Sequence, residues 1–384
     1  LLATVTDMNL TEASAVNDAG AVRRLLDGGA SVNFADTKSG ETALMAAAQA
    51  GATDAAKVLL ERGAAVHRTA RHGKNALHFA VEEGNVAAVE LLLDHKADPD
   101  ASLVGKDDKG NTMPDKWRES EFPLILAIRG GHIPVVETLL RREAGIDTPA
   151  RKNTIASAFA MAAGRDGAGD TPPLKRADTI RLLDLLIGAG LSLRDDPVAV
   201  CAAQSATPEL LKTLLDRGAP PDSWFVGKTD EEEHSALMAT IQRVRLARDA
   251  QQEIGNLDGS LDDYVRSERD GKACFRLLLR RGARVDATTK VGTTAFTEAV
   301  VSHCFDMADE LLRRGANLNA PDTKGRTALH RAVSENDYAD ESTLKYLLKH
   351  GANRSLRDKN GDTALMVARK NKHAKATALL TGRD

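Results

Sequence analysis

The sequence has few aromatic residues, few cysteines and almost no net charge. Phe, Trp and Tyr make up only 3% of its 384 residues, so a core built around large rings is excluded. The three cysteines, Cys201, Cys274 and Cys304, form no Cys-x-x-Cys pair, which argues against a zinc site or a disulfide framework. We interpret them as small core residues. A net charge of -3 provides no overall field for nucleic acid or a membrane surface.

Two short sequence phrases recur along the chain. A Gly-x-Thr-Ala-Leu phrase starts at Gly40, Gly325 and Gly361, and a variant with Asn in place of Thr starts at Gly73. A second phrase, Leu-Leu-x-x-Gly-Ala, closes at Ala64, Ala283, Ala316 and Ala352. Undisturbed neighbouring units lie about 33 residues apart. A fixed period of this size indicates a repeat solenoid.

The repeated phrase resembles that of the ankyrin-repeat family. Thr327-Ala328-Leu329-His330 holds nearly the whole Thr-x-Leu-His element of that family, and Ala76-Leu77-His78 holds a shorter form. The resemblance covers nearly all of the chain. It implies an all-α solenoid of about ten stacked helix-turn-helix units joined by finger loops.

The residues of one unit lead to the same picture. Between Thr42 and Ala64, apolar residues recur at steps of three and four in two short blocks, separated by Gly51. This pattern predicts two short antiparallel helices, with small alanines on the first and leucines on the second. One unit alone cannot bury its apolar face, so stacking on neighbours is required.

On this pattern the whole chain is one ankyrin-repeat solenoid, residues 1–384, with capped ends. Inserts at about 112–122, 165–177 and 243–270 make the middle repeats irregular. The third insert continues helical patterns on both sides, which predicts a helix hairpin longer than its neighbours. Such a hairpin either adds contacts to a partner or is a tolerated surface elaboration. The expected segments are an N-terminal capping unit (1–35), regular repeats (36–111), irregular repeats (112–284), and regular repeats with a C-terminal cap (285–384).

No group of catalytic residues stands out. His78, His132 and His330 occupy places that the ankyrin pattern explains, and in that family such histidines hydrogen-bond neighbouring fingers. The glycine-rich segment 164–169 lacks the lysine and the strand that a phosphate-binding loop needs. The serines form no Gly-x-Ser-x-Gly elbow. We therefore expect no catalytic residues, no cofactor and no metal site.

The resemblance implies a concave groove, lined by finger tips and first helices, whose side chains are free to be chosen for a partner. Signs are mixed along this groove, which suits a folded protein with patterned charge better than a polyanion. The expected partner-binding residues are Lys38, Arg71, His72, Lys74, Lys324, Arg326 and Lys359 on fingers, and Glu82, Glu83 and Arg129 on helices.

Two aromatic features depart from the repeat. Trp224 and Phe225 follow a Pro-Pro-Asp-Ser turn on one finger, and Trp117 with Arg118 lies in the first insert. Tryptophan and arginine are enriched in interface hot spots, so these residues are candidate partner contacts. Alternatively, each ring anchors its insert against the stack, and both interpretations stay open.

The sequence therefore predicts a noncatalytic protein-protein interaction module that binds a folded partner, as an inhibitor, an immunity protein or an adaptor. The alternatives are a secreted effector that binds a host protein, an enzyme or small-ligand protein with a site at the inserts, and a nucleic-acid binder with basic fingers. A basic run from Arg369 to Lys375 is the sole support for the last of these.

The sequence gives weaker signals about membrane insertion, compartment, oligomeric state and source. No run reaches the roughly 18 apolar residues that span a bilayer, so membrane insertion is not expected. Free thiols favour the cytoplasm, although a start at Leu1 leaves room for a cleaved leader. Capped ends indicate a monomer, and the richness in Ala, Arg, Gly and Asp suggests a bacterial source.

Overall fold

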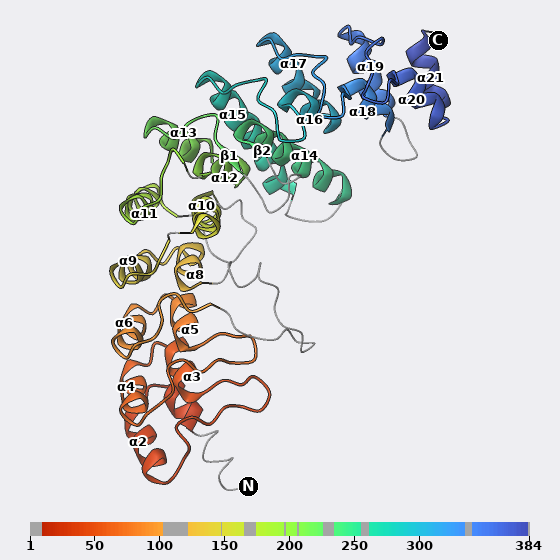
Figure 1. Ribbon diagram of the computed structural model, residues 1–384. Coiled ribbons are helices and arrows are strands. Elements are labelled where there is room, and N and C mark those ends of the chain that lie inside the picture. The colour runs from red at the N-terminus through yellow and green to blue at the C-terminus, as the bar shows by residue number, and fades with distance from the viewer. Residues whose placement is uncertain are drawn as a thin grey trace. The chain divides into compact units, whose positions relative to one another are not determined.

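The structure, a computed structural model, describes residues 10–102, 122–146, 148–164, 174–195, 197–205, 207–225, 234–254, 261–334 and 340–382. Regular structure in these residues is almost entirely α-helical (Figure 1). The described sheet consists of two short strands, β1 (Trp224–Phe225) and β2 (His234–Ser235), which pair antiparallel. The expected all-α fold class is confirmed.

The described helices form two compact units. The first unit contains a short helix over residues 10–15, followed by α2 (Ala19–Asp27), α3 (Ala43–Gln49), α4 (Thr53–Glu61), α5 (Ala76–Glu82), α6 (Val86–Asp94), α8 (Pro123–Gly130), α9 (Ile133–Arg141), α10 (Pro149–Gly164) and α11 (Arg176–Gly188). The second unit contains α12 (Val198–Ser205), α13 (Pro208–Asp216), α14 (Ala236–Ile254), α15 (Leu261–Arg280), α16 (Ala295–Val301), α17 (Phe305–Arg313), α18 (Ala328–Ser334), α19 (Glu341–Lys349), α20 (Ala364–Lys370) and α21 (Ala374–Thr381).

Within each unit the helices alternate between two rows. In the first unit, α3, α5 and α8 pack in one row, while α4, α6, α9 and α11 pack in the other (Figure 1). In the second unit, α12, α14, α16, α18 and α20 form the first row. We call the first helix of each pair the inner helix and the second the outer helix. Helix pairs therefore stack on their neighbours, as the repeat predicts.

The packing follows the residue pattern of the repeat. Ala47 and Ala48 on α3 are at most 1% exposed, and Leu59 on α4 is fully buried. Small side chains let inner helices approach closely, while leucines of the outer helices fill the space between pairs. The expected division between alanine and leucine positions is confirmed.

The inner helices α3, α5, α16 and α20 each begin at a polar side chain that caps them. Thr42, Asn75, Thr294 and Thr363 each accept a hydrogen bond from the backbone amide three residues later. The Thr or Asn of the repeated phrase is therefore a helix N-cap.

Finger loops precede the inner helices α3, α5, α16, α18 and α20, and the tips of several neighbouring fingers are bonded through their backbones. In the first unit the Arg71 amide donates to the Ser39 carbonyl over 2.9 Å. In the second unit the tips at Val291, Thr323, Lys324 and Lys359 are joined by two such bonds, Thr323 N to Val291 O at 3.0 Å and Lys359 N to Lys324 O at 2.9 Å. These bonds fix where each tip side chain starts.

One helix pair is much longer than the others. Helices α14 and α15 have 19 and 20 residues, against 7 to 9 in α16 to α20. They cover most of the third expected insert, of which residues 255–260 lie outside the described residues. Most of the first insert (112–121) and of the second (165–173) also lies outside them, so the expected segment boundaries stay a prediction.

A ring of charges fastens the long hairpin to the next pair. Arg248 of α14 and Lys272 of α15 both bind Glu268, each over 2.9 Å, and both reach Asp306 of α17, at 3.5 and 2.9 Å. Burial alone would raise the pKa of Glu268, but Lys272 and Arg248 hold it below its ordinary value. These ion pairs therefore connect the α14–α15 hairpin to α17, the outer helix of the next pair.

The three cysteines are free and buried, as predicted. Cys201 and Cys304 are 2% and 0% exposed. Burial raises the pKa of Cys201 to about 12 and that of Cys304 to about 11. Their thiols thus stay protonated at neutral pH, and their contribution is to packing.

Helix α19 starts at a capping carboxylate. Asp340 Oδ1 accepts the amides of Ser342 and Thr343, while Oδ2 lies 2.5 Å from His303 Nε2 at the inter-helix turn before α17. Burial alone would raise the pKa of Asp340, but the bonds from Thr343, Ser342 and His303 lower it to about 2. Ionised Asp340 therefore joins two neighbouring pairs.

Glycines at the finger tips provide a first test. Gly292 and Gly361 both have positive φ, +83° and +81°, but a Cβ on Gly292 would lie 2.7 Å from the Thr323 amide nitrogen, whereas one on Gly361 meets nothing within 4 Å. Gly361→Ala should cost about 1 kcal/mol of stability, the strain of a left-handed alanine. Gly292→Ala should cost about 3 kcal/mol, since it also pushes the next finger away. Urea midpoints of both variants measure this, and equal shifts would contradict the tight approach of the two tips.

A second test uses Asp340. Because its pKa in the folded state is lowered to about 2, its contribution to stability is complete above the ordinary carboxyl value of 3.8 and is lost as pH falls from there towards 2. Asp340→Asn should therefore flatten the decline in urea midpoint between about pH 5 and about pH 2. Asp54→Asn, on the exposed surface of α4, is the matched control and should leave the wild-type slope. A wild-type slope in Asp340→Asn would refute the proposed role of this carboxylate.

Candidate functional site

The finger residues of the first unit lie at exposed tips. Asp36 Oδ1 accepts the amides of Lys38 and Ser39, both at 2.8 Å, so it closes the turn of its finger. The bonds from the Ser39 and Lys38 amides hold the pKa of Asp36 below its ordinary value. Lys38 itself is exposed, and its ammonium group has no bonded carboxylate among the described residues. The carboxylate is turned into the loop, and the cation faces solvent.

The next finger of that unit is bonded on two sides. Arg71 donates to the Thr37 carbonyl of the finger before it, and His72 is exposed beside it. Lys74 pairs with Glu82 of the inner helix α5, with 2.6 Å between Nζ and Oε1. Lys74 and Glu82 therefore neutralise each other, and the role of these residues in binding a partner stays a prediction.

The two remaining helix residues lie at the ends of inner helices. Glu83 is the exposed C-cap residue of α5, and Arg129 lies half-buried in the last turn of α8. They mark the inner-helix side of the predicted surface, at the C-terminal ends of α5 and α8.

The fingers of the second unit repeat the arrangement of Asp36. Asp322 Oδ1 accepts the amides of Lys324 and Arg326, both at 2.8 Å, and Oδ2 binds the Arg326 guanidinium at 2.8 and 2.9 Å. Arg326 is therefore neutralised by its own finger. Lys324 is exposed at the tip.

The last finger follows the same rule. Asp358 Oδ1 accepts the amides of Asn360 and Asp362, at 2.9 and 3.0 Å. Burial alone would raise the pKa of Asp358, but the backbone bonds from Asp362 and Asn360 hold it below its ordinary value. Lys359 stands exposed beside it. The structure brings Lys324 and Lys359 onto adjacent tips, bonded through the backbone.

Trp224 lies in β1, where it pairs with Ser235 of β2 just before α14 begins. Its side chain is half-buried, and β1 packs against α12. Phe225 pairs with His234 in the same ladder. Trp117 and Arg118 lie outside the described residues, so their predicted role is untested.

The three repeat histidines have structural partners. His330 is 1% exposed, and its Nε2 lies 3.0 Å from the Asp362 carbonyl of the next finger, as predicted. His78 is fully buried, with Nδ1 2.7 Å from Asn75 Oδ1. His132 differs, because its Nε2 bonds the Glu82 carbonyl at the end of α5 and not a finger. Among the described residues, no three His, Cys, Asp or Glu side chains gather as a metal site requires.

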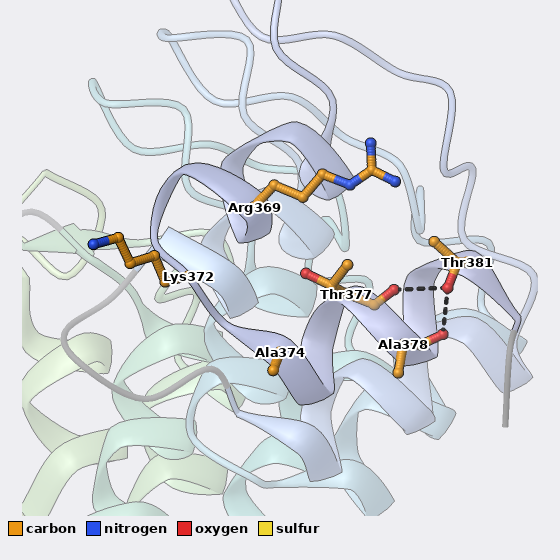
Figure 2. Close-up of a pocket in the computed structure, with 6 residues that line it drawn as sticks. All are labelled: Arg369, Lys372, Ala374, Thr377, Ala378 and Thr381. Carbon is orange, nitrogen blue, oxygen red and sulfur yellow. Dashed lines mark hydrogen bonds between the residues drawn. The ribbon is translucent and has the colours of Figure 1, made fainter.

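An open hollow lies on the last helix pair. It measures about 530 Å³, is open to solvent, and is lined by Arg369, Lys372, Ala374, Thr377, Ala378 and Thr381 (Figure 2). The Thr381 hydroxyl donates to backbone carbonyls of its own helix. The Arg369 and Lys372 side chains point in opposite directions (Figure 2), so the hollow does not converge on one ligand.

Three exposed residues of the second unit were missed in the sequence. Lys290 and Val291 stand at the tip before that of Lys324, and Val291 is 40% exposed. Met366, on inner helix α20, is 39% exposed. Aligning the unit at Gly292 with the others would have found the first two, because that glycine holds the same turn position as Gly325.

A search of the described helices for a membrane-spanning segment finds none with the length and apolar character that a bilayer requires.

Comparison with known proteins agrees with this geometry. Two family models described as ankyrin repeats match the chain, one at residues 10–103, 265–353 and 319–384, the other at 77–140. Mouse inversin is 38% identical over 86 residues, 22% of this chain and 8% of that protein. Human ankyrin repeat domain-containing protein 63 is 33% identical over 111 residues, 28% of this chain and 26% of that protein.

The relatives share repeats with this chain and not their whole length. A worm ankyrin repeat and LEM domain-containing protein 1 homolog, from Caenorhabditis elegans, is 43% identical over 75 residues, 18% of this chain and 11% of that protein. The chain thus spans about a quarter or less of each relative. Because the family models match more than half of its residues, the chain belongs to the ankyrin-repeat family, whose repeats are protein-protein interaction modules.

Proposed function

We propose that this chain is a noncatalytic module that binds a folded protein through its finger tips and inner helices. One observation supports this most strongly. Lys38, Lys324 and Lys359 stand exposed on tips whose backbones are hydrogen-bonded in place, while packing is carried by Ala and Leu positions elsewhere. The backbone of each tip is already ordered before a partner binds, so binding has to order only the side chains.

Within that class we propose an inhibitor, an immunity protein or an adaptor. His132 and His330 bond backbone carbonyls, His78 bonds the capping residue Asn75, and the three cysteines are buried, so these six residues serve the fold. A module of this kind acts by covering a surface of its partner or by holding two proteins together. The hollow on the last helix pair adds little to a ligand-binding alternative, since its two cations diverge.

Affinity capture tests the proposal. The full chain is immobilised and exposed to a lysate of the cells that make it, beside a variant with Lys38→Ala, Arg71→Ala, Lys324→Ala and Lys359→Ala. The wild-type chain should retain one protein at near equal stoichiometry, and the finger variant should lose it at least tenfold, since truncated interface residues commonly cost over 1 kcal/mol.

The matched control carries the same number of cation deletions on outer helices. Arg23, Lys57, Arg276 and Lys349 are exposed and lie on α2, α4, α15 and α19. Their replacement by Ala should leave capture unchanged. If the outer variant loses the partner and the finger variant keeps it, the binding surface has been assigned to the wrong side and the proposal fails.

A further inference from the structure

The finger carboxylates of the second unit form hydrogen bonds or ion pairs with other groups of the same chain. Asp322 binds two amides and the Arg326 guanidinium, and Asp358 binds two amides. Asp362 pairs with Lys370 of α20, and Asp286 accepts the Asn317 amide at 3.0 Å. Each of these carboxylates is held by bonds within the molecule, and those of Asp322 and Asp362 are also paired with a cation of the chain.

The lysines of the same tips differ from these carboxylates. Lys324 and Lys359 are exposed, and no carboxylate among the described residues forms an ion pair with either ammonium group. They start from tips joined by the Lys359 N to Lys324 O bond of 2.9 Å. The tips therefore present the Lys324 and Lys359 ammonium groups to solvent beside carboxylates that are engaged by amides, Arg326 or Lys370.

Apolar side chains accompany these charges. Val291 is 40% exposed on the tip bonded to Thr323, and Met366 is 39% exposed on α20. We call Val291, Lys324, Lys359 and Met366 the tip ridge. Glu298 on α16 is half-buried, and it is the one carboxylate within the described parts of α16, α18 and α20. The ridge therefore combines two uncompensated cations with aliphatic contact area.

We propose that the tip ridge binds an acidic segment of a protein that also carries aliphatic side chains. The inference rests on the proposed function and names the chemistry of the partner. Two lysines facing two carboxylates gain steering and register. An exposed ammonium group and an exposed carboxylate attract each other weakly in water, and salt screens the attraction.

A polypeptide fits the ridge better than a nucleic acid. Affinity for nucleic acid comes mainly from many phosphate contacts, and base stacking needs exposed rings. The ridge offers Val291 and Met366 in their place.

The test measures binding of a defined probe to the full chain. A fluorescein-labelled peptide of alternating Glu and Leu, about ten residues long, is titrated with the protein at low ionic strength and followed by fluorescence anisotropy. Its affinity should fall at least tenfold in the double variant Lys324→Glu/Lys359→Glu. The matched control Lys57→Glu/Lys349→Glu makes the same change in net charge on outer helices and should alter affinity less than about twofold.

Three outcomes overturn the inference. The peptide does not bind the folded wild-type chain, or both double variants weaken it equally, or a labelled oligothymidylate of equal charge binds more tightly and depends on the same two lysines. The last result would assign the ridge to nucleic acid. Far-UV circular dichroism confirms that each variant is folded. Capture from lysate does not depend on this probe, so a failure of peptide binding contradicts the inference on the tip ridge and leaves the proposed function standing. If capture fails while the peptide still binds, the proposed function is contradicted and the preference of the ridge for an acidic segment stands.

Discussion

The structure depends on contact between neighbouring helix pairs, because its helices are too short to stand alone. Most inner and outer helices have seven to nine residues, whereas isolated helices below roughly 12–15 residues are marginal in water. Each pair is stable when its neighbours cover it. The capping residues, the buried alanines and the bonds between finger tips all serve this single requirement.

Much of the fold could be predicted from the sequence because these requirements leave local traces. Thr42 and Asn75 had to be capping residues at the start of a helix, and Gly292 and Gly361 had to allow a left-handed backbone. Such demands act within a few residues, so they recur with the period of the repeat. The bond from His330 to the next finger was predictable for the same reason.

The site was harder to predict because its character depends on where side chains turn. Asp322 and Asp358 look like groove charges in the sequence, and the structure shows each carboxylate closing its own finger. Arg326 and Lys74 likewise appear as free cations until their partners, Asp322 and Glu82, are placed. Periodicity locates a residue on a tip but does not say which bonds its atoms make there. Phe225 illustrates the limit, since its backbone pairing is recorded while its role as contact or anchor stays a prediction.

The long α14–α15 hairpin has a consequence for the order of folding. Its helices, of 19 and 20 residues, are long enough to form much of their structure from contacts close in the sequence, whereas the pairs of seven to nine residues that follow it depend on a neighbour. A repeat stack can nucleate at any point and grow from there. The hairpin, tied to α17 through Arg248 and Lys272, is therefore a natural nucleus from which the second unit assembles, one pair after another towards α21.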